Sequence, residues 1–250
     1  MKTDGAIIVS GAASGLGAAV MQALASDGVR VAGFDLAKIP EEHRPKGATG
    51  YVCDVSDADA VAETAEKVVS DMGSIHGCVC CAGIAPGAKL AGRSGPHDAE
   101  LFLEVMKVNV IGTFNLMRSA AHLMSRNTPD ETGQRGVIVT TASIAAYEGQ
   151  IGQIAYAASK GAVAAMTLPA ARDLASLGIR VVSIAPGIFE TPMVAGLPEE
   201  VRQSLAATIP FPPRLADPAD FAGLVRHIFE NKTLNGSVLR LDGALRMAPR

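Results

Sequence analysis

The chain has 250 residues, of which 48% are hydrophobic, and its formal net charge at pH 7 is −3. This length suffices for one sizeable core, and the near balance of charge, without a basic block, argues against nucleic acid as a ligand. The sequence contains no apolar run of about 18 residues and no strongly basic amphipathic stretch, so we expect no membrane association. No leader-like segment precedes the apolar residues that begin at Ala6, so we expect a cytoplasmic protein.

Short apolar segments alternate with helical patterns along the whole chain. The expected strands are 6–10, 30–35, 50–53, 77–81, 136–142, 180–185 and 237–241, and the expected helices are 57–72, 99–126 and 217–231, one that ends near 26 and one that begins near 155. This alternation predicts an α/β fold: a single doubly wound, Rossmann-like parallel sheet with helices on both faces. We expect one domain over residues 1–250.

Polar or proline-containing stretches separate these elements. Residues 38–48, 86–98 and 128–135 are expected to be loops. Several prolines in 193–215 rule out one regular helix there. We therefore expect a mobile substrate lid around residues 190–215.

The first strand leads into a glycine-rich turn from Gly11 to Gly17, with the spacing GxxxGxG, and a helix follows directly. Free backbone N–H groups and the helix dipole would converge there and favour an anion, and glycines let a pyrophosphate approach the backbone. The residues expected to bind a dinucleotide are Gly11, Ser14, Gly15, Leu16 and Gly17.

Asp35 ends the second strand, close to the distance from the glycine turn at which an acid meets the adenosine ribose. A carboxylate there would accept hydrogen bonds from the 2′-hydroxyl and repel a 2′-phosphate, which favours NAD over NADP. The alternative is a solvated aspartate at a strand end. Because Lys38 and Arg30 are near in sequence, use of both cofactors stays open.

Two further strand ends carry candidate cofactor residues. Asp54 could bind the adenine amino group, with Val55 against the ring. Cys81, Ala82 and Gly83 follow the fourth strand, where small side chains leave space for a cofactor, although helix packing explains them equally well. The four cysteines include no CxxC pair, so we expect buried reduced thiols and no metal site.

Ser143 follows the fifth strand, and Tyr156 and Lys160 are four residues apart. In a helix, Tyr156 and Lys160 share a face, so the ammonium could lower the pKa of the phenol. A serine hydroxyl that holds a substrate oxygen beside a proton-exchanging tyrosine suits the interconversion of alcohol and ketone. By itself, the Tyr-x-x-x-Lys spacing is common by chance.

Asn109 lies within the long pattern of 99–126, although asparagine forms helices poorly. It is either exposed, or a local hydrogen-bonding residue, or the mark of a kink with a bound water. Thr191 follows the sixth strand and could reach a carboxamide. The carboxyl ends of parallel strands form the ligand crevice of such sheets, and the candidate residues of six strands meet there.

Several motifs together resemble the short-chain dehydrogenase/reductase family over essentially the whole chain. They are Gly11 to Gly17, Asp54, Cys81-Ala82-Gly83, Asn109, Ser143, Tyr156 to Lys160 and Pro186-Gly187. The resemblance implies that Tyr156 is the acid/base, that Ser143 orients the substrate oxygen, and that Lys160 binds the nicotinamide ribose as well. It also implies that Asn109 holds a water in a proton relay from Lys160.

Two positions depart from the usual family pattern. Ser10 stands where the family usually has threonine, and the fourth strand ends CCAG where many members have NNAG. Neither change removes a catalytic group. The loss of the asparagine contacts is expected to loosen the turn after that strand.

The C-terminal half looks most like the type 2 3-hydroxyacyl-CoA dehydrogenases, on the stretches 133–163, 166–192 and 234–250. This resemblance implies oxidation of short or branched 3-hydroxyacyl-CoA thioesters with NAD, in a homotetramer. It further implies that Gln150 and Gln153 face the acyl or thioester part of the substrate, and Phe189 and Thr191 the nicotinamide.

Other functions stay open from the sequence. One is a dehydrogenase of the same fold that acts on a steroid, a cyclic alcohol or a 3-oxoacyl carrier-protein thioester. Asp35 argues against the last, which usually uses NADPH. Another is a nicotinamide-binding protein without catalysis, which the intact Asn109, Ser143, Tyr156 and Lys160 make a poor fit.

Overall fold

The computed structural model describes residues 5–93, 95–196 and 198–249. In these residues a seven-stranded sheet has the strand order β3-β2-β1-β4-β7-β8-β9, and every neighbouring pair is parallel. The strands are β1 (Ala6–Ser10), β2 (Val31–Asp35), β3 (Ala48–Val52), β4 (Ile75–Cys80), β7 (Gly136–Thr141), β8 (Ile179–Pro186) and β9 (Val238–Leu241). The predicted doubly wound sheet is therefore confirmed.

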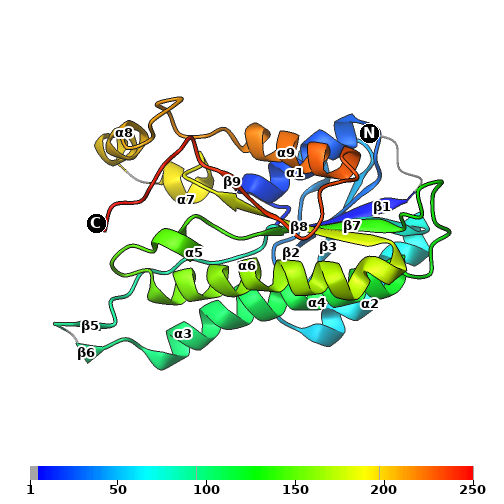
Figure 1. Cartoon of the computed structure of the whole chain (residues 1–250), viewed down its shortest axis with the longest axis horizontal. Coiled ribbons are helices and arrows are strands. Elements are labelled where there is room, and N and C mark those ends of the chain that lie inside the picture. Colours follow the sequence, from blue (N-terminus) through cyan, green and yellow to red (C-terminus); the bar gives the residue numbers. More distant parts are fainter. Residues whose placement is uncertain (1–4, 94, 197, 250) are drawn as a thin grey trace.

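Helices cover both faces of this sheet (Figure 1). The helices of the described residues are α1 (Gly15–Ser26), α2 (Ala58–Met72), α3 (Ala99–Met106), α4 (Gly112–Met124), α5 (Ala145–Glu148), α6 (Ile154–Leu174), α7 (Pro192–Ala195), α8 (Glu199–Ala207) and α9 (Pro218–Glu230). Residues of α1 and α9 share one buried apolar cluster, and residues of α2, α4 and α6 share the other. The strand β1 supplies Ile7 and Val9 to the first cluster and Ala6 and Ile8 to the second, as alternation along a strand requires.

Two expected loops contain regular structure. The segment 38–48 includes a 3₁₀ turn, η1 (Glu41–His43), and β3 begins at Ala48, two residues earlier than predicted. The reason is the pairing register, because Val31 lies opposite Ala48 and the whole of β2 pairs with β3. In 86–98, β5 (Ala91–Gly92) and β6 (Gly95–Pro96) form a small antiparallel pair.

The single helix predicted over 99–126 is wrong in detail. A π-helical segment, η2 (Lys107–Ile111), separates α3 from α4 and contains Asn109. Such segments accommodate one extra residue per turn and are frequent at functional sites. The residue that the sequence flagged as a poor helix former therefore lies in an irregular turn.

The segment expected to form a lid contains the two short helices α7 and α8, which agrees with the prediction that no single helix spans it. Arg202 of α8 makes ion pairs with Glu199 at 2.9 Å and with Glu190. The mobility of this segment stays a prediction. Among the described helices, none is both long and apolar enough to cross a bilayer.

Candidate active site

The carboxyl ends of the strands open into one cavity of about 530 Å³. Most of the site residues expected from the sequence line it: Gly11, Ser14, Gly15, Leu16, Gly17, Asp35, Asp54, Val55, Cys81, Ala82, Gly83, Ser143, Gln153, Tyr156, Lys160, Phe189 and Thr191. Asn109 and Gln150 are the two that do not. The strand ends therefore meet at a single crevice, as the alternating pattern implied.

The glycine turn has the geometry of an anion site. Gly11 adopts a φ of +65°, and a Cβ on Gly17 would lie 2.2 Å from the carbonyl oxygen of Gly11, so a side chain at 17 would collide with the backbone. Ser14, the N-cap of α1, makes no capping bond with its side chain, and the first turn of α1 carries no acidic residue. The first turn of α1 therefore offers N–H groups to an anion with no acidic side chain of its own beside them, which suits a pyrophosphate.

Asp35 has a structural role beside its expected one. Its Oδ2 accepts a hydrogen bond from the backbone N–H of Ala13 at 2.9 Å, and its Oδ1 accepts one from Ala37 at 3.1 Å. The carboxylate thus fixes the glycine turn while lining the cavity. Arg30 precedes the opposite end of β2 and donates to the carbonyl oxygen of Met72, which places it far from the ribose position.

The turn after β4 is held by side chains from two other elements. The Ser10 hydroxyl accepts hydrogen bonds from the backbone N–H groups of Cys81 and Ala82, both at 3.1 Å. The Oδ1 of Asn109 accepts another from Ile84 at 2.8 Å. The bonds that tether this turn therefore come from Ser10 and Asn109, and the expected loosening by CCAG stays a prediction.

Ser143, Tyr156 and Lys160 come together at the far end of the same cavity. Ser143 follows β7 and hydrogen-bonds the phenol of Tyr156, which lies on the first turns of α6. The Nζ of Lys160 lies 5.7 Å from the centre of the Tyr156 ring and donates to the carbonyl oxygen of Thr141 at 2.7 Å. A serine hydroxyl, a phenol and an ammonium group therefore converge on one point, as predicted.

Burial governs the protonation of this group. It raises the pKa of Tyr156, and the hydrogen bond from Ser143 opposes that rise. Burial also lowers the pKa of Lys160, to about 8. From the sequence we expected Lys160 to lower the pKa of Tyr156. In the structure the pKa is raised instead, because loss of solvation on burial outweighs the hydrogen bond from Ser143.

The side chain of Asn109 is fully buried and makes no contact with the cavity. Besides accepting from Ile84, its Nδ2 donates to the carbonyl oxygen of Ile84 and to the hydroxyl of Ser159, both at 2.9 Å. The side chain thus makes long-range hydrogen bonds that join η2 to the turn after β4 and to α6, which none of the three alternatives from the sequence described. A Cβ on Gly83 would lie 3.1 Å from Asn109 Oδ1 and 3.6 Å from Lys160 Nζ, so only a glycine separates the two residues.

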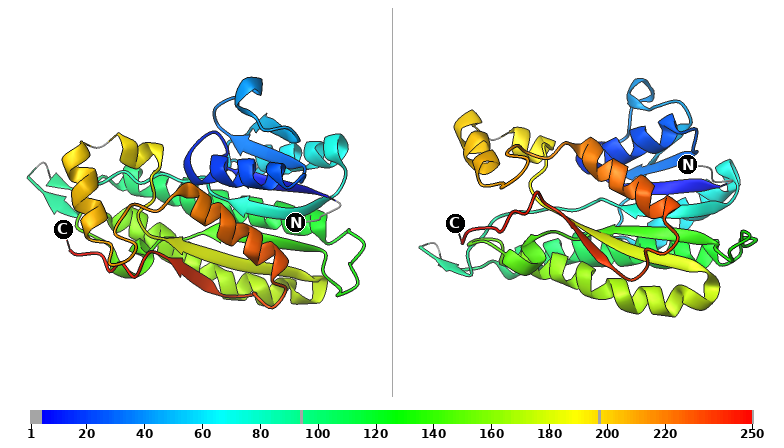
Figure 2. Two further views of the ribbon diagram at one scale, coloured as in Figure 1. Left: turned by 90° about the horizontal axis from the view of Figure 1, so that it is seen from above. Right: turned by 45° about the horizontal axis from the view of Figure 1, so that its top comes forward.

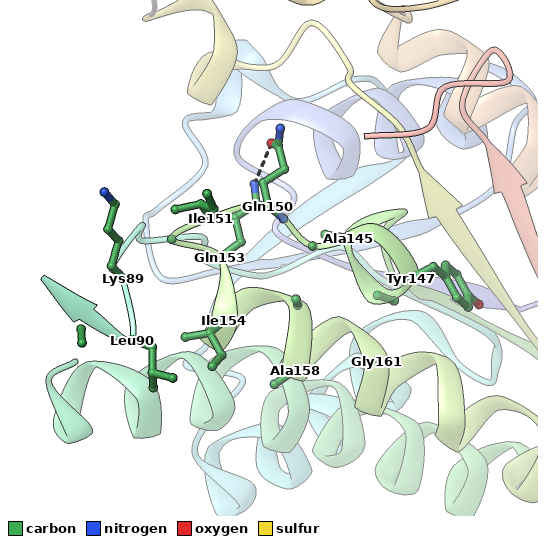
Figure 3. A pocket seen from close by; sticks show the side chains of 15 residues that line it. Lys89, Leu90, Ala145, Tyr147, Gln150, Ile151, Gln153, Ile154, Ala158 and Gly161 are labelled. Atoms are coloured by element: carbon green, nitrogen blue, oxygen red, sulfur yellow. Dashed lines mark hydrogen bonds between the residues drawn. The ribbon is translucent and has the colours of Figure 1, made fainter. Parts of the chain in front are cut away.

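The two glutamines expected to face the substrate differ in position. Gln153 lines the cavity, but Gln150 lines a second, more open hollow of about 750 Å³ between α5, α6 and the chain around Lys89 (Figure 3). The backbone N–H of Gln150 donates to Gln153 Oε1 at 3.1 Å, and its amide donates to the carbonyl oxygen of Ala248 at 3.0 Å. The side chain of Gln150 therefore holds the C-terminal segment, and its expected contact with the acyl or thioester part of the substrate stays a prediction.

The cavity also has apolar walls that the sequence did not single out. Its further lining residues include Leu36, Ile84, Val108, Ile188, Val194 and Met247. Leu36 follows Asp35 directly and is 71% exposed. The cysteines are free thiols, as expected, and burial raises the pKa of Cys81 to about 12.

Comparisons with known proteins agree with this site. A family model described as enoyl-(acyl carrier protein) reductase matches residues 11–245. The 3-hydroxyacyl-CoA dehydrogenase type-2 of Bos taurus is 47% identical over 97% of this chain and 95% of its own, and the ipsdienol dehydrogenase of Ips pini is 33% identical over 97% of each. The crystal structure of 3-hydroxyacyl-CoA dehydrogenase type-2 from Mycobacterium avium has a TM-score of 0.92 at 39% identity, covering 99% of this chain and 98% of that one. The chain is therefore an oxidoreductase that belongs to the short-chain dehydrogenase/reductase family, whose dehydrogenases use a nicotinamide cofactor.

Proposed function

We propose that this enzyme interconverts a short or branched 3-hydroxyacyl-CoA and its 3-oxoacyl-CoA with NAD. The observation that carries the proposal is the hydrogen-bonded pair of Ser143 and Tyr156 beside Lys160, in the same cavity as the glycine turn. The bovine and mycobacterial relatives named as 3-hydroxyacyl-CoA dehydrogenases support the substrate class.

The chemistry assigned to the chain's own residues is proton transfer at one oxygen. In the oxidative direction the substrate hydroxyl binds between Ser143 and Tyr156, and the tyrosine oxygen takes its proton. In the reductive direction the phenol returns a proton to the carbonyl oxygen. The bound nicotinamide supplies or accepts the hydride at the neighbouring carbon. Because burial raises the pKa of Tyr156, the phenol holds its proton at neutral pH and can act as an acid in the reductive direction.

The residues proposed to hold the cofactor follow the cavity from one end to the other. The glycine turn holds the pyrophosphate, Asp35 the adenosine ribose, Asp54 and Val55 the adenine, and Lys160 the nicotinamide ribose. Cys81, Ala82 and Gly83 line the path between them, and Phe189 and Thr191 lie at the nicotinamide end. Asp35 makes NAD the preferred cofactor because its charge repels a 2′-phosphate. A water relay through Lys160 toward the backbone of Asn109 also belongs to the proposal.

The direct test is reduction of acetoacetyl-CoA followed by the loss of nicotinamide absorbance, with NADH and NADPH in parallel. Rapid oxidation of NADH and slow oxidation of NADPH is the expected result. Equal rates with both cofactors would reject Asp35 as the selector. Absence of turnover, with NADH binding shown by fluorescence, would reject the thioester.

A second candidate substrate is a secondary alcohol without a thioester, such as a steroid or a cyclic alcohol. The 33% identity to a dehydrogenase named for ipsdienol favours keeping it. The same assay with a panel of such alcohols and NAD separates the two. Only an enzyme specific for thioesters is expected to show a much higher kcat/KM when the substrate carries a CoA group.

We also propose a homotetramer. Large apolar side chains are exposed along α3, η2, α4 and α6: Leu103, Ile111, Phe114, Ile154 and Leu168 are between 40% and 57% exposed. Adjacent exposed apolar side chains on packed helices are typical of subunit interfaces. Light scattering after size-exclusion chromatography gives the mass, and Phe114→Glu is expected to lower it. An unchanged mass in that variant would place the interface elsewhere.

The cytoplasmic location stays a prediction. The four cysteines are free in the structure, as a reducing compartment allows. Fractionation of the cells that make the protein would decide the matter.

A further inference from the structure

The residues after β9 run toward the side of the molecule where α7 and α8 lie (Figure 2), and they contribute to the wall of the catalytic cavity. We call residues 242–249 the C-terminal strap. One of them, Met247, lines the cavity and is half-buried, although it is far in sequence from every other lining residue. The strap is therefore part of the active site wall, and its position depends on what anchors it.

The main anchor is Glu148, the last residue of α5. Its carboxylate accepts hydrogen bonds from Arg240 Nη1 at 2.9 Å and Nη2 at 3.2 Å, and from the backbone N–H of Met247 at 3.1 Å. Arg240 also donates to Asp242 at 2.6 Å and to the carbonyl oxygen of Leu245 at 3.0 Å. The charge pair lowers the pKa of Glu148 and raises that of Arg240, so the anchor stays ionised at neutral pH.

Two more hydrogen bonds hold the end of the strap. The amide of Gln150 donates to the carbonyl oxygen of Ala248, and the backbone N–H of Ile151 donates to that of Pro249, both at 3.0 Å. These donors lie in the chain between Ser143 and Tyr156. The strap is therefore fixed to the segment between the two catalytic hydroxyl groups.

Apolar packing connects the strap to the lid. Leu245 is 2% exposed and shares a buried cluster with Ile144 and Ile209, against which Met247 packs. Ile144 follows the catalytic Ser143, and Ile209 lies just after α8. The backbone N–H of Phe211 donates to the carbonyl oxygen of Gly243 at 3.3 Å. The strap thus spans the distance between the catalytic loop and the end of the lid.

We propose that Met247 selects substrates by size, by closing the acyl end of the cavity, and that Glu148 is a positioning residue that sets the place of Met247. The inference deepens the proposed function, because it assigns the wall met by the substrate chain. A methionine suits this role since its flexible, polarisable side chain fits chains of different shape. The glycine turn and Asp35 belong to other elements, so the strap leaves the cofactor end of the cavity untouched.

The test compares Met247→Ala and Met247→Phe with the unchanged enzyme on two parallel series of substrates. One series is 3-oxoacyl-CoA thioesters of increasing chain length, and the other is methyl ketones of increasing length. Removing the side chain is expected to raise kcat/KM for long over short substrates about tenfold or more, and phenylalanine to lower that ratio by a similar factor. NADH affinity is expected to stay unchanged in both variants.

The positioning role of Glu148 has its own measurement. Glu148→Gln is expected to raise the ratio of kcat/KM for long over short substrates by about two- to fivefold, as Met247→Ala does. The change is expected to come from a lower KM for long substrates. The substitution is also expected to speed the release of C-terminal residues by carboxypeptidase. Glu66→Gln is the matched control, because Glu66 pairs with Arg126 at 3.5 Å on the surface of the protein and is expected to change neither quantity.

The outcomes separate the two proposals. Length profiles that stay unchanged in both Met247 variants would overturn the role of Met247. A Glu148→Gln enzyme with an unchanged profile would overturn the positioning role. An enzyme that reduces plain ketones as well as CoA thioesters would reject the thioester substrate, and the ketone series alone would then decide the role of Met247.

Discussion

The cofactor half and the substrate half of the cavity are built in different ways. The cofactor half consists of the turns after β1, β2, β3 and β4, where short-range geometry and backbone N–H groups define the site. The substrate half consists of α5, the lid and the strap, which contact one another across long sequence separations, as the Glu148 carboxylate does with the backbone N–H of Met247. A nicotinamide dinucleotide is one fixed molecule, whereas substrates vary, so the first half is specified by backbone shape and the second by exchangeable side chains.

Tyr156 lies where the two halves meet, and removing its hydroxyl is the change expected to distinguish catalysis from cofactor binding most clearly. Tyr156→Phe is expected to lower turnover by about 10²–10⁴-fold, because the proton transfer is lost, while NADH affinity stays unchanged. Steady-state rates and fluorescence titration measure the two quantities. Tyr147→Phe is the control, since that tyrosine is 54% exposed and is expected to keep full activity. Near-normal turnover in Tyr156→Phe would reject the assigned acid/base.

Gly17→Ala tests whether backbone shape carries the cofactor half. The new Cβ would lie 2.2 Å from the carbonyl oxygen of Gly11, so the turn must move, and NADH affinity is expected to fall about tenfold or more. Gly223→Ala in α9 is the control, because a Cβ there meets no atom within 4 Å. That variant is expected to gain about 0.5–1 kcal/mol of stability. Unchanged affinity in Gly17→Ala would contradict the backbone-defined site.

Substitutions of Asp35 separate the effect of its charge from that of its hydrogen bond to the glycine turn. Asp35→Asn keeps an oxygen able to accept the Ala13 hydrogen bond but removes the charge, and is expected to reduce the preference for NADH over NADPH about tenfold. Asp35→Ala removes both and is expected to weaken both cofactors as well. The ratio of kcat/KM values for the two cofactors measures the change. A preference that survives Asp35→Asn would place selectivity elsewhere.

The pH dependence of the two reaction directions tests the protonation of Tyr156 without any substitution. Burial raises the pKa of Tyr156, so the phenol is protonated throughout the neutral range. Reduction, which needs the protonated form, is expected to be flat there and to fall in alkali. Oxidation needs the phenolate and is expected to rise by up to tenfold per pH unit. A flat oxidation profile between neutral and alkaline pH would show that proton transfer does not limit the rate.

The difference between the halves also explains what could be predicted from the sequence. Asp35, Asp54 and Ser143 were found because each follows an apolar strand, and strand ends of a parallel sheet share one edge. The contact of Gln150 with the strap and the place of Met247 in the cavity wall were not predicted, because contacts between segments far apart in sequence leave no periodic pattern. The three hydrogen bonds of the Asn109 side chain join segments 25 and 50 residues away, and no local rule indicates such partners.

The π-helical turn around Asn109 has a consequence for chain length. An α-helix turns about 100° per residue, so deleting one residue from 107–111 to restore a regular helix would rotate every later position of α4 by that angle. The buried stripe of α4, which includes Leu116, Ala120 and Met124, would then turn away from the sheet. The extra residue therefore sets the rotation of α4 relative to α3 about their common axis. The two helices stay continuous through η2, while α4 keeps its buried side chains directed at the sheet.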